Sequence, residues 1–311
     1  MKQIKSAESW LNGLYVDPVK LRFERGMKGK KHFVEWLVGY QAIIDFYSAV
    51  PGGASEAERV RMHVLNHLNI LDTPAYHDLA STDRKRFSED VLSYLYACSL
   101  AKDFGFDMKF YLAEISQILP RIYEHAPSRG ASQRMALIRR LGALGLPATD
   151  AMNLLIDKTQ IRQRKSVAEL QKIHVYLMVH EISHLTDGGR HPPKLLNIGD
   201  MAYLSDLMEG LLDPMLEDVD LLSEVIEAMI CLGFVNNENI RKALSFIALS
   251  QNENGSFGAY EDERNSLRLQ GSAYDVDVGM YLHATTVCLR ALIAANAHSV
   301  GREGEFACSL Q

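Results

Sequence analysis

Apolar residues recur at helical spacing along almost the whole of this 311-residue chain. Runs of Val, Ile and Thr with period-two alternation, which would indicate a large sheet, are missing, and nine prolines leave room for long helices. The sequence therefore predicts an all-α protein. The expected helices cover about 31–49, 56–70, 85–103, 107–124, 132–145, 149–157, 166–186, 200–213, 218–233, 237–251 and 280–297.

Composition and charge restrict the environment and the partners that we expect. Apolar residues make up 47% and charged residues 23%, which is ordinary for a globular protein and excludes a disordered chain. The net charge of -6 gives no general attraction to nucleic acid or to an anionic membrane, so neither is expected as a partner. Four widely spaced cysteines and the lack of an apolar signal-like run near the start predict a cytoplasmic protein.

The chain carries no stretch that reads as a flexible interdomain linker. We therefore expect a single helical domain over 1–311, with a division into an N-terminal helical part, 1–130, and a C-terminal part, 131–311, as the alternative. Residues 281–295 have one formal charge, that of Arg290, and a helix that is apolar nearly all round is buried on all sides.

The segment 242–258 is the most specific string in the sequence. It reads Lys-Ala-Leu-Ser-Phe-Ile-Ala-Leu-Ser-Gln-Asn-Glu-Asn-Gly-Ser-Phe-Gly and resembles the QW repeat of triterpene cyclases, with Phe257 in place of the tryptophan. Prenyltransferase β-subunits and lanthionine cyclases are similar here. We expect Phe246 and Ile247 to be buried, Gln251 to bond backbone groups of a neighbouring helix, Gly255 to turn the chain and Phe257 to pack over the glutamine.

This resemblance implies an α/α toroid, in which inner helices surround a central cavity and outer helices pack outside them. Two further strings are similar to an uncharacterised bacterial toroid family: His180, Thr186, Asp187 and Gly189 in one, and His283, Thr285 and Thr286 in the other. We therefore expect paired inner and outer helices from about residue 130, preceded by an N-terminal helical extension. Residues 258–279 would form a long loop before an inner helix at 281–295.

Polar residues on the expected inner helices give the candidate catalytic set, which is His180, Asp187, His283 and Arg290. Two imidazoles and a carboxylate suit Zn²⁺ or Fe²⁺, so His180, Asp187 and His283 are the candidate metal ligands. Without a metal, His180 could act as a general base with Asp187 fixing its tautomer. Parallel inner helices would place His180, near a helix end, and His283, near a helix start, at opposite ends of the cavity.

Three other groups of residues offer competing interpretations. His180-Glu181-Ile182-Ser183-His184 matches the H-E-x-x-H pattern of zinc hydrolases. Asp275 and Asp277 could converge on one cation, although a solvated loop is the simpler reading. His63 and His67 are a second pair at helical spacing, expected on the surface.

These observations predict an enzyme that acts on a small molecule in a toroid cavity, with Zn or Fe as the cofactor if one is bound. A non-catalytic helical binding or scaffold protein is the first alternative, and Arg290 would then pair with an internal carboxylate. An H-E-x-x-H zinc hydrolase is the second.

Overall fold

The structure, a computed structural model, describes residues 2–14, 16–25, 28–213, 218–235, 238–258 and 277–308. These residues form helices joined by loops, and their β-type pairing is an isolated bridge between Gln251 and Phe257. The α-helices are α1 (Lys2–Asn12), α2 (Pro18–Arg25), α3 (Gly29–Ala49), α4 (Ala54–His67), α5 (Arg84–Asp103), α6 (Lys109–His125), α7 (Ala131–Ala143), α8 (Gln160–Gln163), α9 (Lys172–Thr186), α10 (Ile198–Leu212), α11 (Val219–Cys231), α12 (Glu238–Leu249) and α15 (Leu282–Cys308).

The expected all-α class is confirmed, and most of the expected helices are present within a few residues of their bounds. The expected helix at 149–157 is wrong, because this stretch folds as two short 3-10 turns, Met152–Leu154 and Ile156–Lys158. Helices α1 and α2 were not predicted, because they are short and lie before the first strongly periodic segment.

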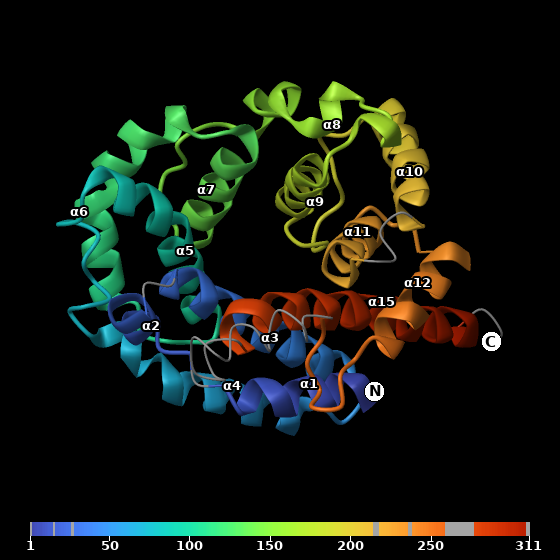
Figure 1. Ribbon diagram of the computed structural model, residues 1–311, viewed down its shortest axis with the longest axis horizontal. Coiled ribbons are helices and arrows are strands. Elements are labelled where there is room, and N and C mark those ends of the chain that lie inside the picture. The colour runs from blue at the N-terminus through green and yellow to red at the C-terminus, as the bar shows by residue number, and fades with distance from the viewer. Residues whose placement is uncertain are drawn as a thin grey trace.

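Six helices contact one another in a closed cycle. In chain order α3 packs on α5, α5 on α7, α7 on α9, α9 on α11, α11 on α15, and α15 returns to α3. Figure 1 shows these helices around the middle of the molecule, with α3 and α15 side by side along one edge. Several of the largest core side chains, including Trp36 and Tyr94, belong to these helices and are fully buried.

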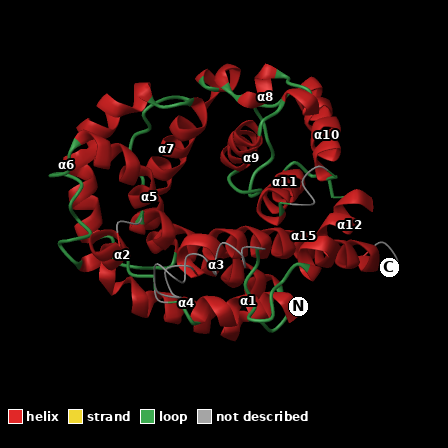
Figure 2. Ribbon diagram, in the orientation of Figure 1, coloured by secondary structure: helices red, strands yellow, loops and turns green. Residues whose placement is uncertain are grey.

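The helices between consecutive members of the cycle lie at the periphery. Helix α4 packs on α3, α6 on α5, α8 on α9, and α10 and α12 on α11. Figure 2 shows these five helices toward the outside of the molecule. The expected N-terminal extension is wrong, because α3 and α5 belong to the same cycle as the C-terminal helices. The first 130 residues therefore supply two of its six members.

The QW-like string forms the local structure that its residues predict, with one exception. Phe257 is fully buried, and the Gln251 amide donates to the carbonyl groups of Gly255 and, in α1, of Gln3. Gly255 has a φ of +95°, and a Cβ there would lie 2.2 Å from a backbone oxygen of α1. The exception is Phe246, whose side chain is 36% exposed. Most of the expected loop 258–279 lies outside the described residues.

Residues 281–295, most of which belong to α15, are largely buried, as their composition predicts. By length and composition the stretch Asp277–Ala297 could cross a membrane, but 61% of the relevant window is buried inside the protein, between α3 and α11. A core helix satisfies the same criterion, so its apolar character is explained by packing.

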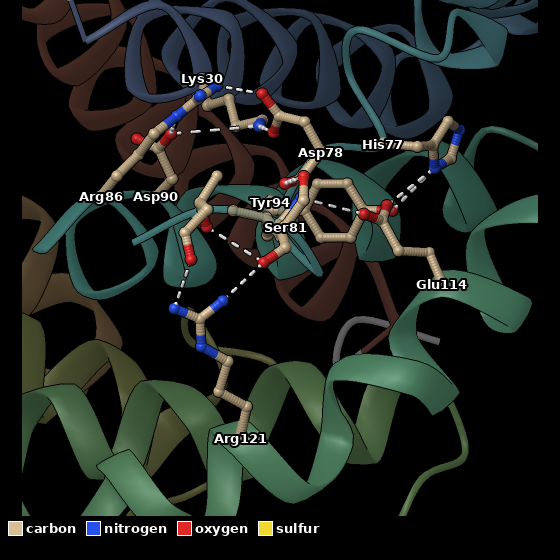
Figure 3. Close-up of polar contacts among 11 residues, drawn as sticks. Lys30, His77, Asp78, Ser81, Arg86, Asp90, Tyr94, Glu114 and Arg121 are labelled. Atoms are coloured by element: carbon tan, nitrogen blue, oxygen red, sulfur yellow. Dashed lines mark hydrogen bonds and ion pairs between the residues drawn. The ribbon is translucent and has the colours of Figure 1, made fainter. Parts of the chain in front are cut away.

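A buried polar network fastens the segment between α4 and α5 to the cycle (Figure 3). Lys30 of α3 is almost fully buried, and its ammonium group lies 2.7 Å from Asp78 and 3.9 Å from Asp90. Nearby, Glu114 of α6 accepts hydrogen bonds from the Tyr94 hydroxyl and the backbone N–H of Leu79. Opposite charges and donors therefore satisfy one another here, and we interpret the network as structural.

Candidate metal centre

The structure brings two of the predicted residues, His180 and His283, to one carboxylate. The Nε2 atom of His180 lies 3.7 Å from Glu224 Oε1, and His283 Nε2 lies 3.5 Å from the same oxygen. The expectation that the two histidines occupy opposite ends of the cavity is therefore wrong. His180 lies in the body of α9, two turns before its end, and α15 is preceded by the π-helical turn Asp277–Tyr281, which places His283 deeper than the first turn of the helical segment.

The other two predicted residues lie elsewhere. Asp187 is the left-handed C-cap of α9, about 10 Å along the helix from His180, and its ion-pair partner is His191 at 4.0 Å. It belongs to no group of three potential metal ligands among the described residues, so the structure does not bring it together with His283 as the sequence predicted. Arg290 pairs with Glu227 of α11, which is the internal carboxylate that the scaffold interpretation requires.

A group that could hold a metal forms instead from Asp220, Glu224 and His283. Each offers one ligand atom, and these atoms all lie within 4.8 Å of one another. Asp220 and Glu224 are four residues apart on α11 and so share one helix face. His283 comes from α15, which packs directly against that face. Among the described residues this is the group with three potential ligands.

Two carboxylate oxygens of this group are buried and accept no hydrogen bond. They are Asp220 Oδ1 and Glu224 Oε2, and the Glu224 residue is only 6% exposed. A buried, unsatisfied carboxylate oxygen is costly, and such groups in native proteins call for an ion or a water. His283 Nε2 lies 3.4 Å from Asp220 Oδ1, so a protonated His283 or a bound cation can supply the positive charge that these oxygens face.

Each ligand side chain has a neighbour that fixes its orientation. His283 Nδ1 lies 3.3 Å from Glu35 Oε1 of α3, and the second oxygen of Glu35 lies 3.2 Å from His32 Nδ1. The Tyr176 hydroxyl donates to Asp220 Oδ2 at 3.2 Å. A carboxylate that accepts the second ring N–H of a ligating histidine is typical of metal sites. Here it leaves His283 Nε2 facing Asp220 and Glu224.

The charges of the cluster are strongly coupled. Burial tends to raise the pKa of Glu224, but hydrogen bonds with His180 and His283 lower that pKa to about 2. Burial alone would lower the pKa of His283, yet hydrogen bonds to Glu224 and Glu35 and the charge of Asp220 raise it to about 10. The geometry therefore stabilises a positive charge among three carboxylates, which a protonated imidazole supplies when no other cation is present.

A cavity of about 260 Å³ is lined by residues from all six helices of the cycle, including Asp187 and Arg290. The three potential metal ligands do not line it. Glu227 and Ser183 do, and they lie about one helical turn along α11 and α9 from Glu224 and His180.

The H-E-x-x-H residues do not form a metal site among the described residues. Glu181 is 2% exposed, and its carboxylate accepts the backbone N–H of Gln160 in α8 at 2.8 Å, away from the cavity. His184 belongs to no group of three potential ligands.

The remaining candidate residues from the sequence form no group of three potential metal ligands among the described residues. Asp275 lies outside the described residues, and Asp277 belongs to no described metal group. His63 and His67 are half-buried rather than fully on the surface, because their rings pack on Tyr40 and Trp36.

Three residues of this site, Asp220, Glu224 and Glu35, were not predicted from the sequence. A signal for the first two was present, since a pair of carboxylates at positions i and i+4 interrupts a helix that is otherwise strongly apolar. Glu35 offered no such signal, because its role depends on the packing of α3 against α15, which are separated by most of the chain.

Comparison with known proteins adds a family but no activity. Neither curated proteins nor solved structures give a significant match to the chain. The family model described as Domain of unknown function (DUF6895) matches residues 50–293, a range that includes Asp220, Glu224 and His283 but not Glu35. Since this match covers well over half of the sequence, the chain belongs to the DUF6895 family.

Proposed function

We propose that this protein is an enzyme that acts on a small molecule in a central cavity, with a divalent metal ion held by Asp220, Glu224 and His283. The observation that carries the proposal is the pair of buried, unsatisfied oxygens, Asp220 Oδ1 and Glu224 Oε2, in a group completed by His283. The six-helix cycle and its peripheral helices support an α/α toroid as the architecture that encloses the cavity.

The donor set favours a borderline metal ion. Two carboxylates and one imidazole suit Zn²⁺, Fe²⁺ or Mn²⁺ better than Ca²⁺, which prefers oxygen ligands only. Three protein ligands leave positions open, and a metal held in this way supplies an acidified water or a Lewis acid for a substrate oxygen.

The chain's own residues have separate roles in this proposal. Glu35 holds the His283 tautomer through Nδ1, and Tyr176 orients Asp220. The side chain of His180 is 53% exposed and lies beside Glu224, so it can take or deliver a proton at the substrate. It is a candidate base rather than a fourth ligand, because its position lies outside the group of three.

Metal titration of the apo-protein by calorimetry tests the proposal, with Zn²⁺, Mn²⁺ and anaerobic Fe²⁺ as separate titrants. We expect one equivalent of at least one ion to bind. The variants Glu224→Gln and His283→Ala should abolish this binding, and Glu35→Gln should weaken it by about 10–100-fold. His184→Ala and Asp187→Asn are the matched controls and should bind as the unaltered protein does. The proposal fails if none of the three ions binds, or if Glu224→Gln retains full affinity.

A non-catalytic binding protein is the second candidate. The internal pairing of Arg290 with Glu227 favours it, because this buried arginine needs no ligand to balance its charge. Absence of metal binding in every titration would support this alternative.

A further inference from the structure

The cavity has carboxylates at one end. Asp45 lies in the last turn of α3, Asp103 is the last residue of α5, and Asp187 caps α9, and all three line the cavity. The carboxyl ends of these helices therefore meet at one mouth, where their dipoles add partial negative charge. Arg190 also lines the cavity, and its positive charge acts on Asp45 and Asp103.

Two guanidinium groups lie further inside. Arg140 of α7 stacks over the ring of Tyr96 at 3.6 Å and donates to the Ser99 hydroxyl at 3.2 Å. Ser99 and Tyr96 are four and seven residues before Asp103 on α5, which places the Arg140 guanidinium about 6–10 Å from the mouth. Arg290, which pairs with Glu227, lines the same region.

Some polar atoms of the lining have no hydrogen-bond partner among the residues that the structure describes. Arg140 Nε is buried and donates no hydrogen bond, and Gln41 Oε1 is buried and accepts none, although the Gln41 amide nitrogen donates to Asp45. A guanidinium group presents five N–H donors, so Arg140 retains capacity for an anionic acceptor. The carbonyl oxygen of Gln41 in turn requires an N–H donor.

We propose that the cavity binds a dipolar small molecule, with an ammonium group at Asp45 and Asp103 and a carboxylate at Arg140. The proposal rests on the proposed function for the cavity's role as the substrate site, and it adds the substrate class. A spacing of roughly 6–10 Å between the two charged zones suits an ω-amino acid or a short peptide. The N–H donor that Gln41 requires is available in the ammonium group or in an amide.

Calorimetry with charge-matched ligands tests this class. 6-Aminohexanoate carries both charges, whereas hexanoate and hexylamine each carry one on a chain of the same length. We expect 6-aminohexanoate to bind at least about tenfold more tightly than either single-charge compound, since a hydrogen bond to a charged group contributes that much. The proposal is overturned if hexanoate or hexylamine binds equally well, or if 6-aminohexanoate does not bind.

Two cavity variants test which end of the cavity binds the carboxylate and which end binds the ammonium group. Arg140→Gln should weaken 6-aminohexanoate and hexanoate by about tenfold and leave hexylamine unchanged, and Asp103→Asn should weaken 6-aminohexanoate and hexylamine instead. Arg241→Gln, an exposed position outside the cavity, is the control. Unchanged 6-aminohexanoate affinity in both cavity variants would overturn the assignment.

Repeating the titration in EDTA separates this proposal from the metal proposal. The ligand contacts come from the helices alone, so binding of 6-aminohexanoate should persist without metal. Binding in EDTA combined with failed metal titrations would sink the metal centre and leave the ligand class standing.

Discussion

Glu181 shows how a short motif can suggest chemistry that the packing of a residue does not support. It occupies the general-base position of H-E-x-x-H, yet it points away from the cavity and accepts backbone N–H groups of α8. Burial raises the pKa of its carboxyl from 4.5 to about 7 in the folded protein. Its role is therefore to satisfy backbone donors at the edge of the cycle.

This pKa predicts how stability depends on pH. Between pH 4.5 and 7 the folded protein binds the Glu181 proton and the unfolded chain releases it, so stability should fall as pH rises through this window. Between pH 4.5 and pH 7.5 we expect the free energy of unfolding of the unaltered protein to fall by about 3 kcal/mol more than that of the Glu181→Gln variant. Urea unfolding of both proteins at both pH values measures the difference. Equal pH dependence would contradict the prediction.

Phe257 and Phe246 form a matched pair within the QW-like string, because one is fully buried and the other is 36% exposed. Phe257→Ala should reduce the free energy of unfolding by about 3–5 kcal/mol, since it leaves a cavity between α1, α12 and α15. Phe246→Ala should cost much less. Chemical denaturation of the two variants measures this difference, and similar losses would show that Phe257 is not packed as the buried aromatic of the string.

At the scale of elements, apolar periodicity predicted the helices, which depend on nearby residues. It did not predict how the helices are placed relative to one another, which depends on distant residues. The helices α9, α11 and α15 were expected, because each has a long apolar pattern, although α9 begins at Lys172 rather than 166 and α15 ends at Cys308 rather than 297. The positions of these helices along one another were not predicted. For this reason His180 and His283 were expected at opposite ends of the cavity. Glu224 was not predicted, because the sequence pattern pointed to histidines, whereas the carboxylate that lies beside both of them is on α11, between α9 and α15.

The attachment of the 68–83 segment to α3 and α5 provides a test at this scale. Lys30→Met removes the buried cation that faces Asp78 and Asp90. Stability should fall by about 3 kcal/mol, at the low end for a broken buried pair, because Arg86 still faces both carboxylates. Lys242→Met, which breaks an exposed pair with Glu238, is the control and should cost less than about 1 kcal/mol. Equal losses in denaturant titrations of the two variants would refute the attachment role.

For the whole molecule, the closed cycle predicts that residues 1–130 and 131–311 unfold together. The two parts meet at two seams, α5 with α7 and α3 with α15, so neither part has a separate core. Both tryptophans, Trp10 and Trp36, lie in the first part, whereas far-ultraviolet circular dichroism reports on the helices of both. Their urea transitions should coincide. A tryptophan transition at a distinctly different urea concentration would indicate two domains.

The seam between α3 and α15 also bears on biosynthesis. The Thr286 hydroxyl of α15 donates to the backbone carbonyl of Glu35 in α3, across a separation of 251 residues. At roughly 5–20 residues per second, a ribosome needs on the order of 10–50 s to make the intervening chain. Throughout this interval the apolar face of α3 that α15 will cover has no native partner from the same chain. The nascent protein should therefore depend on chaperones until α15 has emerged.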